Sequence, residues 1–173
     1  MAAPASSVVG FIDMDCFYVS VEVRRDPSLK GLPVAVCQYE AQAVSTPTVP
    51  ASADRRVTRG GAAFIAVSYE ARARGVTRMM LAAEGRRVCP ELITVMVPTA
   101  EGKADLAIYK DAGQSVCDVL QHHADRVEKR SVDEVAIDVT HKAETLLRST
   151  PFPAVPLRCF LIFTSPARAT PAL

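Results

Sequence analysis

Two apolar segments that lie far apart in the chain are each bounded by carboxylates, and this constrains the fold more than any other feature. Residues 8–14 end an apolar run at Asp13, and in residues 131–139 the acids Asp133 and Glu134 precede one. Both segments are typical of buried strands. If the strands are neighbours in one sheet, their carboxylates meet at its rim, where they repel each other unless a cation neutralises them. Oxygen ligands without His or Cys suit Mg²⁺ or Mn²⁺, although solvated acids at strand ends remain the alternative.

A second group of charged residues surrounds a short helix predicted at residues 68–75, which begins with a Ser N-cap and ends at Gly. Arg72 and Arg78 lie on either side of the point where this helix ends. Guanidinium groups placed in this way can converge on one anion and suit phosphate oxygens. The alternative interpretation is a solvated helix face on which Glu70 pairs with Arg74.

Hydrophobic spacing predicts further elements. Apolar runs predict strands at 33–39 and 92–97, and helical periodicity predicts helices at 79–88 and 103–123. Apolar residues alternate over 17–23, which favours a strand there. Residues 41–63 are rich in Ala, Ser, Thr and Pro and carry Arg55, Arg56 and Arg59, so they are expected to form a flexible surface loop.

Composition places the chain among globular proteins. Its 173 residues favour one domain, and a net charge of +1 means that any phosphate binding depends on local placement rather than on a bulk field. Five scattered cysteines without a CxxC pair argue against a disulfide framework and a zinc site. The N-terminus lacks the features of a signal peptide, and the apolar run Cys159–Phe163 is too short to span a bilayer. The sequence predicts a soluble, intracellular protein without membrane contact.

Four segments resemble the Y-family of translesion DNA polymerases, and in particular its eta branch. They occur in the family's order, from about Val9 to Thr140, and the loop from Ala41 to Arg59 interrupts them. The segments read FIDMDCFYVSVE, LPVAVCQY, IAVSYEARARGVTR and RSVDEVAIDVT.

The resemblance implies a site for nucleotidyl transfer from a dNTP to a primer 3′-hydroxyl. Asp13, Asp133 and Glu134 match the catalytic carboxylates, and Met14 matches the residue whose backbone carbonyl also reaches a metal. Two Mg²⁺ ions, or Mn²⁺ in their place, would activate the hydroxyl and stabilise the leaving pyrophosphate.

The resemblance also assigns the residues that bind the nucleotide. They are Phe17, Tyr18, Tyr69, Arg72 and Arg78, with Gln38 near the templating base. Tyr18 matches the aromatic steric gate that leaves no room for a ribose 2′-hydroxyl, where the eta branch usually has Phe. Tyr69 and Arg72 match the pair that contacts the triphosphate, and Arg78 matches an arginine over the incoming base.

The implied fold class is α+β, a partial polymerase palm (a ferredoxin-like sheet with helices) with an inserted small fingers subdomain. The expected divisions are 1–16 for the first palm strand, 17–104 for the fingers with the loop at 41–63, and 105–148 for the rest of the palm. In this family, residues 17–23 are helical. The Pro-rich tail at 149–173 does not match the family and is expected to be disordered.

The family continues with more palm, a thumb, a little finger and a lysine at the triphosphate site. We therefore expect weak DNA affinity and little or no polymerase activity from this chain alone. Primer–template DNA and dNTP are the implied partners, the nucleus is the implied location, and a sliding clamp would be reached only through regions absent here. Two alternatives are a non-catalytic short isoform that acts as a binding or regulatory module, and another palm-fold enzyme such as a nucleotide cyclase.

Overall fold

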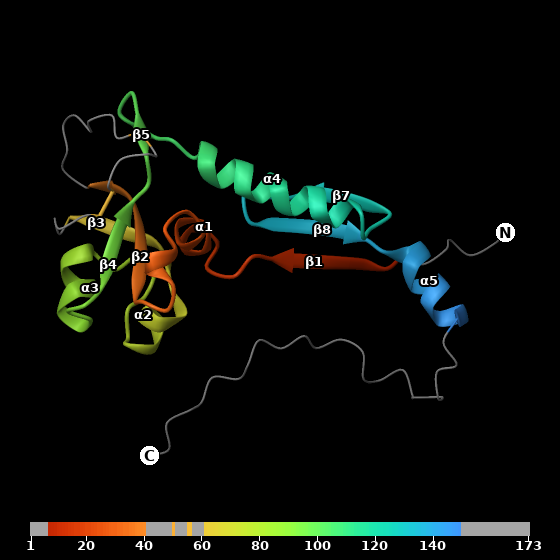
Figure 1. The fold of residues 1–173 in the computed structure, drawn as a ribbon, viewed down its shortest axis with the longest axis horizontal. Helices are drawn as coiled ribbons and strands as arrows, with labels where there is room; N and C mark the ends of the chain where they lie inside the picture. The colour runs from red at the N-terminus through yellow and green to blue at the C-terminus, as the bar shows by residue number, and fades with distance from the viewer. Residues whose placement is uncertain (1–6, 41–49, 51–54, 57–60, 150–173) are drawn as a thin grey trace, which may run out of the picture.

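A computed structural model describes residues 7–40, 50, 55–56 and 61–149, and its three-stranded antiparallel sheet contains both acidic segments (Figure 1). The strand order is β1-β8-β7, formed by β1 (Val9–Asp13), β8 (Glu134–Asp138) and β7 (Arg126–Lys129). The two strands expected from the apolar runs are therefore neighbours, as predicted. The polar segment that forms β7 was not predicted, because its sequence RVEK has one apolar residue and no buried face.

The long helix α4 (Ala107–Gln121) lies along this sheet, and α5 (Thr140–Ser149) follows β8 (Figure 1). Tyr109, Gly113 and Cys117 are buried on α4, so the predicted helical periodicity is confirmed. The predicted start at residue 103 is wrong. Glu101 and Gly102 have positive φ values and form a tight turn between the short strands β5 (Thr99–Ala100) and β6 (Lys103–Ala104).

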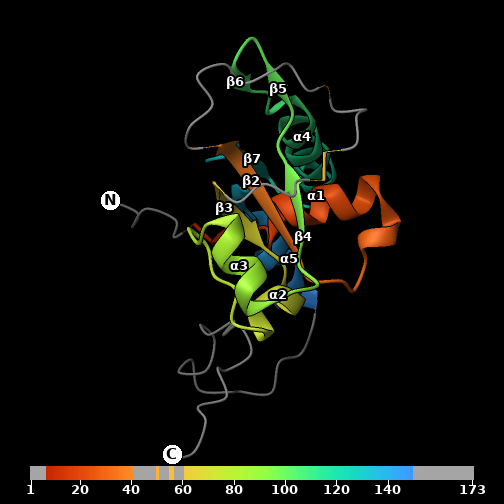
Figure 2. The ribbon, with the colours of Figure 1, turned by 90° about the vertical axis from the view of Figure 1, so that its left-hand side faces the viewer.

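A second sheet has the order β3-β2-β4, from β3 (Ala62–Val67), β2 (Val34–Glu40) and β4 (Ile93–Met96). Strand β2 is antiparallel to β3 and parallel to β4. Short helices α2 (Tyr69–Ala73) and α3 (Ala82–Val88) lie on one side of this sheet, and α1 (Phe17–Arg25) lies between the two sheets (Figures 1 and 2). The 3₁₀ turn η1 (Pro27–Leu29) leads from α1 into β2. The mixture of helices and mainly antiparallel sheets confirms the α+β class.

The strand predicted from alternation at residues 17–23 is wrong, because this segment is helix α1. Phe17, Val19, Val21 and Glu22 are all buried. The helix packs between the second sheet and α4, so side chains over a wide arc are buried and their spacing imitates a strand. The helical conformation that the family resemblance implies is the correct one.

The interpretation of residues 41–63 as one surface loop is wrong in two places. Ala62 and Ala63 already belong to β3, and the Arg55 side chain is only 4% exposed. The helix predicted at 79–88 begins only at Ala82, since Met79 has a φ of 69° and Leu81 forms a β-bridge with Ala63. The tail was predicted at 149–173, but Ser149 is the last residue of α5. The rest of the predicted tail, Arg59 and Cys159 lie outside the described residues.

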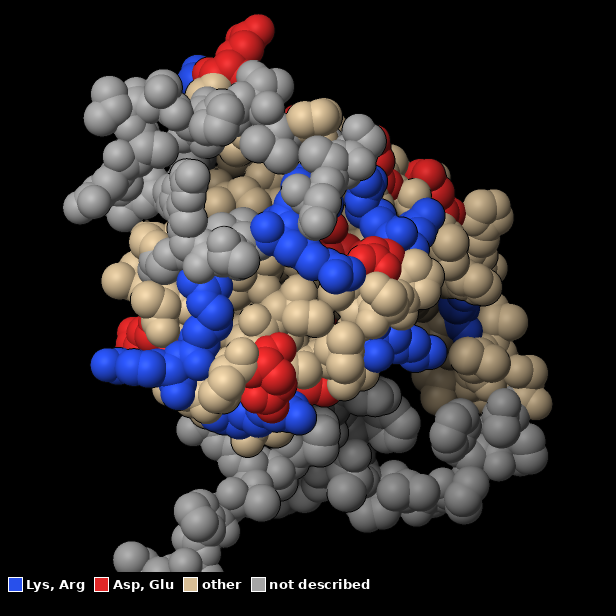
Figure 3. Space-filling model, turned by 60° about the vertical axis from the view of Figure 1, so that its left-hand side comes forward, with Lys and Arg blue, Asp and Glu red and all other residues tan. Residues whose placement is uncertain are grey.

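Charge is mixed on one face of the molecule. On the face shown in Figure 3, the Lys and Arg side chains lie among Asp and Glu rather than in one broad basic field. This agrees with the net charge of +1. Within the described part of the chain, no helix has the length and apolar character needed to cross a membrane.

Candidate active site

Strand register brings the predicted carboxylates to one end of the first sheet. Asp13 at the end of β1 lies directly opposite Glu134 at the start of β8. The backbone N–H of Met14 donates to the carbonyl oxygen of Asp133 over 2.9 Å, which extends the pairing by one step. The expected meeting of the two acidic segments is therefore confirmed at the level of the backbone.

A turn around Ser131 holds Asp133 in place. The Ser131 hydroxyl donates to Asp133 Oδ1 over 2.8 Å and accepts from the backbone N–H of Glu134 over 3.1 Å. One side chain thus fixes both the carboxylate and the start of β8 beside it.

The donor set is of the kind that Mg²⁺ binds, since Asp13, Asp133, Glu134 and the backbone of Met14 offer only oxygen atoms. Among the described residues, however, no three His, Cys, Asp or Glu side chains are placed around a point where they could hold a metal ion. The strands bring the donors to the same rim, and the residues fit the cation in kind. Their side chains would have to come closer together to bind it.

A cleft of about 1280 Å³ extends from this rim to the second sheet. Asp133 and the segment from Asp13 to Tyr18 line one part of it, and residues of β3, α2 and the turn after α2 line the rest. The predicted site residues along the cleft are Asp13, Met14, Phe17, Tyr18, Tyr69, Arg72, Arg78 and Asp133. Asp13 and Asp133, which are 120 positions apart in the sequence, therefore line the same cleft.

Tyr18 lies in the first turn of α1 and lines the cleft. Its ring packs against that of Tyr109, with centroids 4.5 Å apart and planes tilted by 46°. Burial raises the pKa of Tyr18, and the negative charge of Asp133 raises it further. The hydroxyl therefore stays protonated beside the carboxylate.

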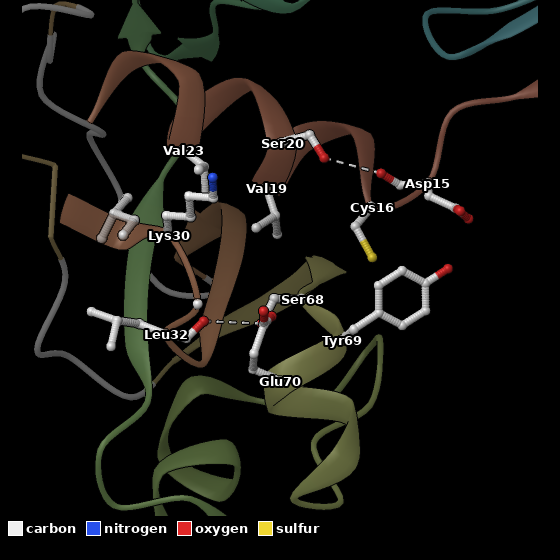
Figure 4. A pocket seen from close by; sticks show the side chains of 12 residues that line it. Asp15, Cys16, Val19, Ser20, Val23, Lys30, Leu32, Ser68, Tyr69 and Glu70 are labelled. Carbon is white, nitrogen blue, oxygen red and sulfur yellow. Dashed lines mark hydrogen bonds between the residues drawn. The ribbon is translucent and has the colours of Figure 1, made fainter. Parts of the chain in front are cut away.

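Tyr69 and Arg72 form the opposite wall from consecutive turns of α2. The Arg72 guanidinium lies 5.2 Å from the centroid of the Tyr69 ring, and its Nε donates to the Val67 carbonyl over 3.1 Å. Figure 4 shows the Tyr69 hydroxyl directed toward Asp15. A hydrogen bond with this carboxylate raises the pKa of Tyr69. Asp15 thus helps to orient this wall.

Four of the predicted residues lie differently from the rest. Phe17 is 5% exposed and belongs mainly to the core, although it borders the cleft. Gln38 on β2 and Glu134 are not among the residues that line the cleft. Arg74 does not form the considered ion pair with Glu70. Its Nε pairs with Glu91 over 2.7 Å, while its Nη1 donates to the Glu70 backbone carbonyl.

Sequence reasoning missed a buried polar group behind Tyr18. The Tyr109 hydroxyl donates to Glu22, and Glu22 forms a two-armed ion pair with Arg55 at 2.9 and 2.5 Å. Burial lowers the pKa of Arg55, but Glu22 outweighs it and the net direction is upward, so the guanidinium stays charged. Nothing in the local sequence around Arg55 indicates a buried cation.

The family was identified by comparison with known proteins. The model of the impB/mucB/samB family matches residues 12–154, which include Asp13, Asp133, Glu134, α1 and α2. The chain belongs to this family. The match agrees with the Y-family resemblance that the four segments indicate.

Named relatives are DNA polymerases. The chain is 42% identical over 154 residues to DNA polymerase eta of Arabidopsis thaliana and 41% identical over 133 residues to that of Drosophila melanogaster. These matches cover 87% and 77% of this chain but only 20% and 13% of the relatives. The chain thus spans a fifth or less of the length of these two polymerases.

Solved structures show the same fold. A Y-family polymerase chimera of Dbh and Dpo4 matches with a TM-score of 0.60 and 30% identity, over 80% of this chain and 34% of the chimera. An insertion ternary complex of Dbh DNA polymerase matches with a TM-score of 0.60 and 28% identity, over 80% of this chain and 34% of that chain. The fold is that of the catalytic portion of Y-family polymerases.

Proposed function

We propose that this chain carries the nucleotide and metal site of a translesion, damage-bypass DNA polymerase of the eta type. The observation that carries the proposal is the β1–β8 register. It sets Asp13 opposite Glu134, next to Asp133, at one end of a cleft whose other wall presents Tyr69 and Arg72. An acidic rim facing aromatic and cationic groups suits a nucleoside triphosphate bound with divalent cations.

Each side of the cleft has its own task in this proposal. Asp13, Asp133, Glu134 and the Met14 carbonyl would hold two Mg²⁺ ions, which supply charge neutralisation and activation of the primer hydroxyl. Tyr69 and Arg72 bind the triphosphate. Because nucleotidyl transfer needs little covalent chemistry from the protein, the work of these residues is positioning and electrostatic stabilisation.

The base and sugar are proposed to lie between the two sides. Arg78 borders the cleft and would contact the incoming base, while the ring of Tyr18 closes the space beside the sugar. Gln38 is assigned to the templating base on resemblance alone. The partners are dNTP and primer–template DNA, and a nuclear location follows from chromosomal DNA as the template.

Equilibrium dialysis of the full chain with dATP tests the site without requiring catalysis. We expect binding in Mg²⁺ that is lost in EDTA and weakened at least about tenfold by Asp13→Asn, since neutralising one ligand removes a direct metal contact. Asp111→Asn on α4, outside the cleft, is the matched control and should bind like the wild type. Absence of Mg²⁺-dependent binding would contradict the proposal.

Primer extension is a second test. We expect little or no synthesis by the chain alone, because grip on a duplex comes from many phosphate contacts and a net charge of +1 provides little general attraction to phosphates. Robust templated synthesis by the chain alone would contradict this expectation.

A further inference from the structure

The polar group behind Tyr18 consists of Arg55, Glu22 and Tyr109, and it has no part in the proposed chemistry. Glu22 is 3% exposed, Arg55 7% and Tyr109 fully buried. Charged side chains are almost never so deeply buried unless they are paired. A buried ion pair adds little to stability compared with apolar packing, so its presence calls for an explanation other than stability.

Backbone contacts fix Arg55 from outside. Its Nη1 donates to the Met96 carbonyl over 2.6 Å, and its own carbonyl accepts from the Met96 N–H over 2.8 Å. The next residue, Arg56, forms a β-bridge with Val95. The guanidinium is thereby anchored to β4. Arg55 itself lies in the segment that interrupts the resemblance to the polymerase family.

From Arg55 the contacts lead directly to the cleft. Arg55 holds both oxygens of Glu22, Glu22 accepts the hydroxyl of Tyr109, and the Tyr109 ring packs on Tyr18. Tyr18 is the last member and the one that lines the cleft. Each contact in this series is either a charged hydrogen bond or a ring contact. A shift of Glu22 would therefore change the position of the Tyr18 ring.

We propose that Arg55 is a positioning residue that, through Glu22 and Tyr109, holds the Tyr18 ring in the cleft and so sets the preference for a deoxyribose over a ribose. The inference rests on the proposed function for its ligand, a nucleoside triphosphate. It adds to that function a residue which touches no substrate. A ring that is free to tilt opens space beside the sugar, and a ring that is held in place closes it.

Three variants of the full chain separate the roles. Arg55→Met removes the cation. Tyr109→Phe removes only the hydroxyl and keeps both the ring contact with Tyr18 and the Arg55–Glu22 ion pair. The second variant therefore still tests the proposal if Arg55→Met fails to fold. Arg56→Met is the matched control, because the neighbouring Arg56 side chain is exposed and pairs with Asp26 on the outside.

Two measurements are made on each variant. Equilibrium dialysis with Mg²⁺ gives the affinity ratio for dATP over ATP. Fluorine NMR of protein labelled with 3-fluorotyrosine, with the Tyr18 signal assigned through Tyr18→Phe, reports on the ring without any nucleotide. We expect Arg55→Met and Tyr109→Phe to reduce the affinity ratio by about tenfold and to shift or broaden the Tyr18 signal, while Arg56→Met changes neither.

The two proposals fail in different ways. If the wild type prefers dATP and neither Arg55→Met nor Tyr109→Phe changes the ratio or the Tyr18 signal, the inference about Arg55 is overturned and the proposed function stands. If the wild type binds no nucleotide, the proposed function fails, and the fluorine signal alone decides whether Arg55 holds the Tyr18 ring. A uniform loss of affinity for both nucleotides with an unmoved Tyr18 signal also overturns the inference.

Discussion

The distance between helix α4 and the loop that carries Asp133 is set by one missing methyl group. A Cβ built on Gly113 would lie 2.4 Å from the carbonyl oxygen of Val132, the residue before Asp133. This contact is far shorter than van der Waals distance, and backbone on both sides leaves little room for adjustment. Gly113 therefore permits the close approach of α4 to the loop that carries Asp133.

We predict that Gly113→Ala destabilises the fold. Overpacking of this kind costs about 1–3 kcal/mol, and the gain in helix propensity of up to about 1 kcal/mol offsets only part of it. Urea unfolding followed by circular dichroism measures the difference. Gly61→Ala is the control, because a Cβ there meets nothing within 4 Å. Equal stability of the two variants would refute the close approach.

A second residue-scale prediction concerns Asp138 at the end of β8. Its Oδ1 accepts hydrogen bonds from the hydroxyl and the backbone N–H of Thr140, at 2.6 and 2.9 Å, and these hold the pKa of Asp138 below its ordinary value of 3.8. The unfolded chain thus takes up the proton first. The hydrogen bonds of Asp138 therefore contribute to stability above pH 3.8, the ordinary pKa, and this contribution is lost as the pH falls through the lower pKa of the folded state.

The test measures the free energy of unfolding from neutral pH down to about pH 3. We expect Asp138→Asn to show a smaller loss of stability on acidification than the wild type. Thr140→Val, which removes the hydroxyl donor, should reduce the same acid-dependent component. Wild-type and Asp138→Asn curves with identical slopes would show that the pair makes no such contribution.

At the scale of elements, the start of α2 shows how one side chain can join two segments. Ser68 is 4% exposed, and its hydroxyl accepts from the N–H of Ala71 in α2 and from the N–H of Val34 in β2. It caps the helix that carries Tyr69 and Arg72 and also ties it to the central strand of the second sheet.

We predict that Ser68→Ala lowers the free energy of unfolding by about 1–2 kcal/mol, because a helix cap is lost and a buried N–H loses its acceptor. Thermal unfolding measures it. Ser20→Ala serves as the control, since the exposed Ser20 hydroxyl only donates to the Asp15 carbonyl. A loss no greater than that of the control would contradict the double role of Ser68.

For the whole molecule, the first sheet has an exposed edge. Among the described residues β1 pairs only with β8, and its side chains Val9 and Phe11 are each 62% exposed. An edge strand with exposed apolar residues favours pairing with other chains. This part of the fold is the least protected against self-association.

We predict that the chain self-associates as its concentration rises and that Phe11→Thr reduces this, because a β-branched residue also favours a strand while the aromatic surface is removed. Light scattering coupled to size-exclusion chromatography measures the mass. Leu147→Thr on α5, which is 63% exposed but not on the sheet, is the matched control. A monomeric wild type at all concentrations would disprove the role of this edge.

Much of the site was predictable because short-range patterns determine it. The apolar runs ending at Asp13 and beginning after Glu134 predicted two strands with acids at one rim, and the register confirms their pairing. Ser68 and Gly75 predicted the bounds of α2 in the same way, since capping and a positive φ are local properties. The match to family segments named the nucleotide residues, whose individual roles remain predictions.

Only the tertiary structure decided the rest, because those features depend on contacts between distant residues. Alternation at residues 17–23 predicted a strand, but burial between α4 and the second sheet makes it helix α1. The sequence around Arg55 predicts a surface residue, but in the fold Glu22, 33 positions away, supplies the counter-charge that allows Arg55 to be buried. The sequence by itself determined where the acids stand and which local elements carry them. The packing of α1 and α4 decided what lies behind the cleft, since burial and pairing are set by neighbours in space, not by neighbours in the chain.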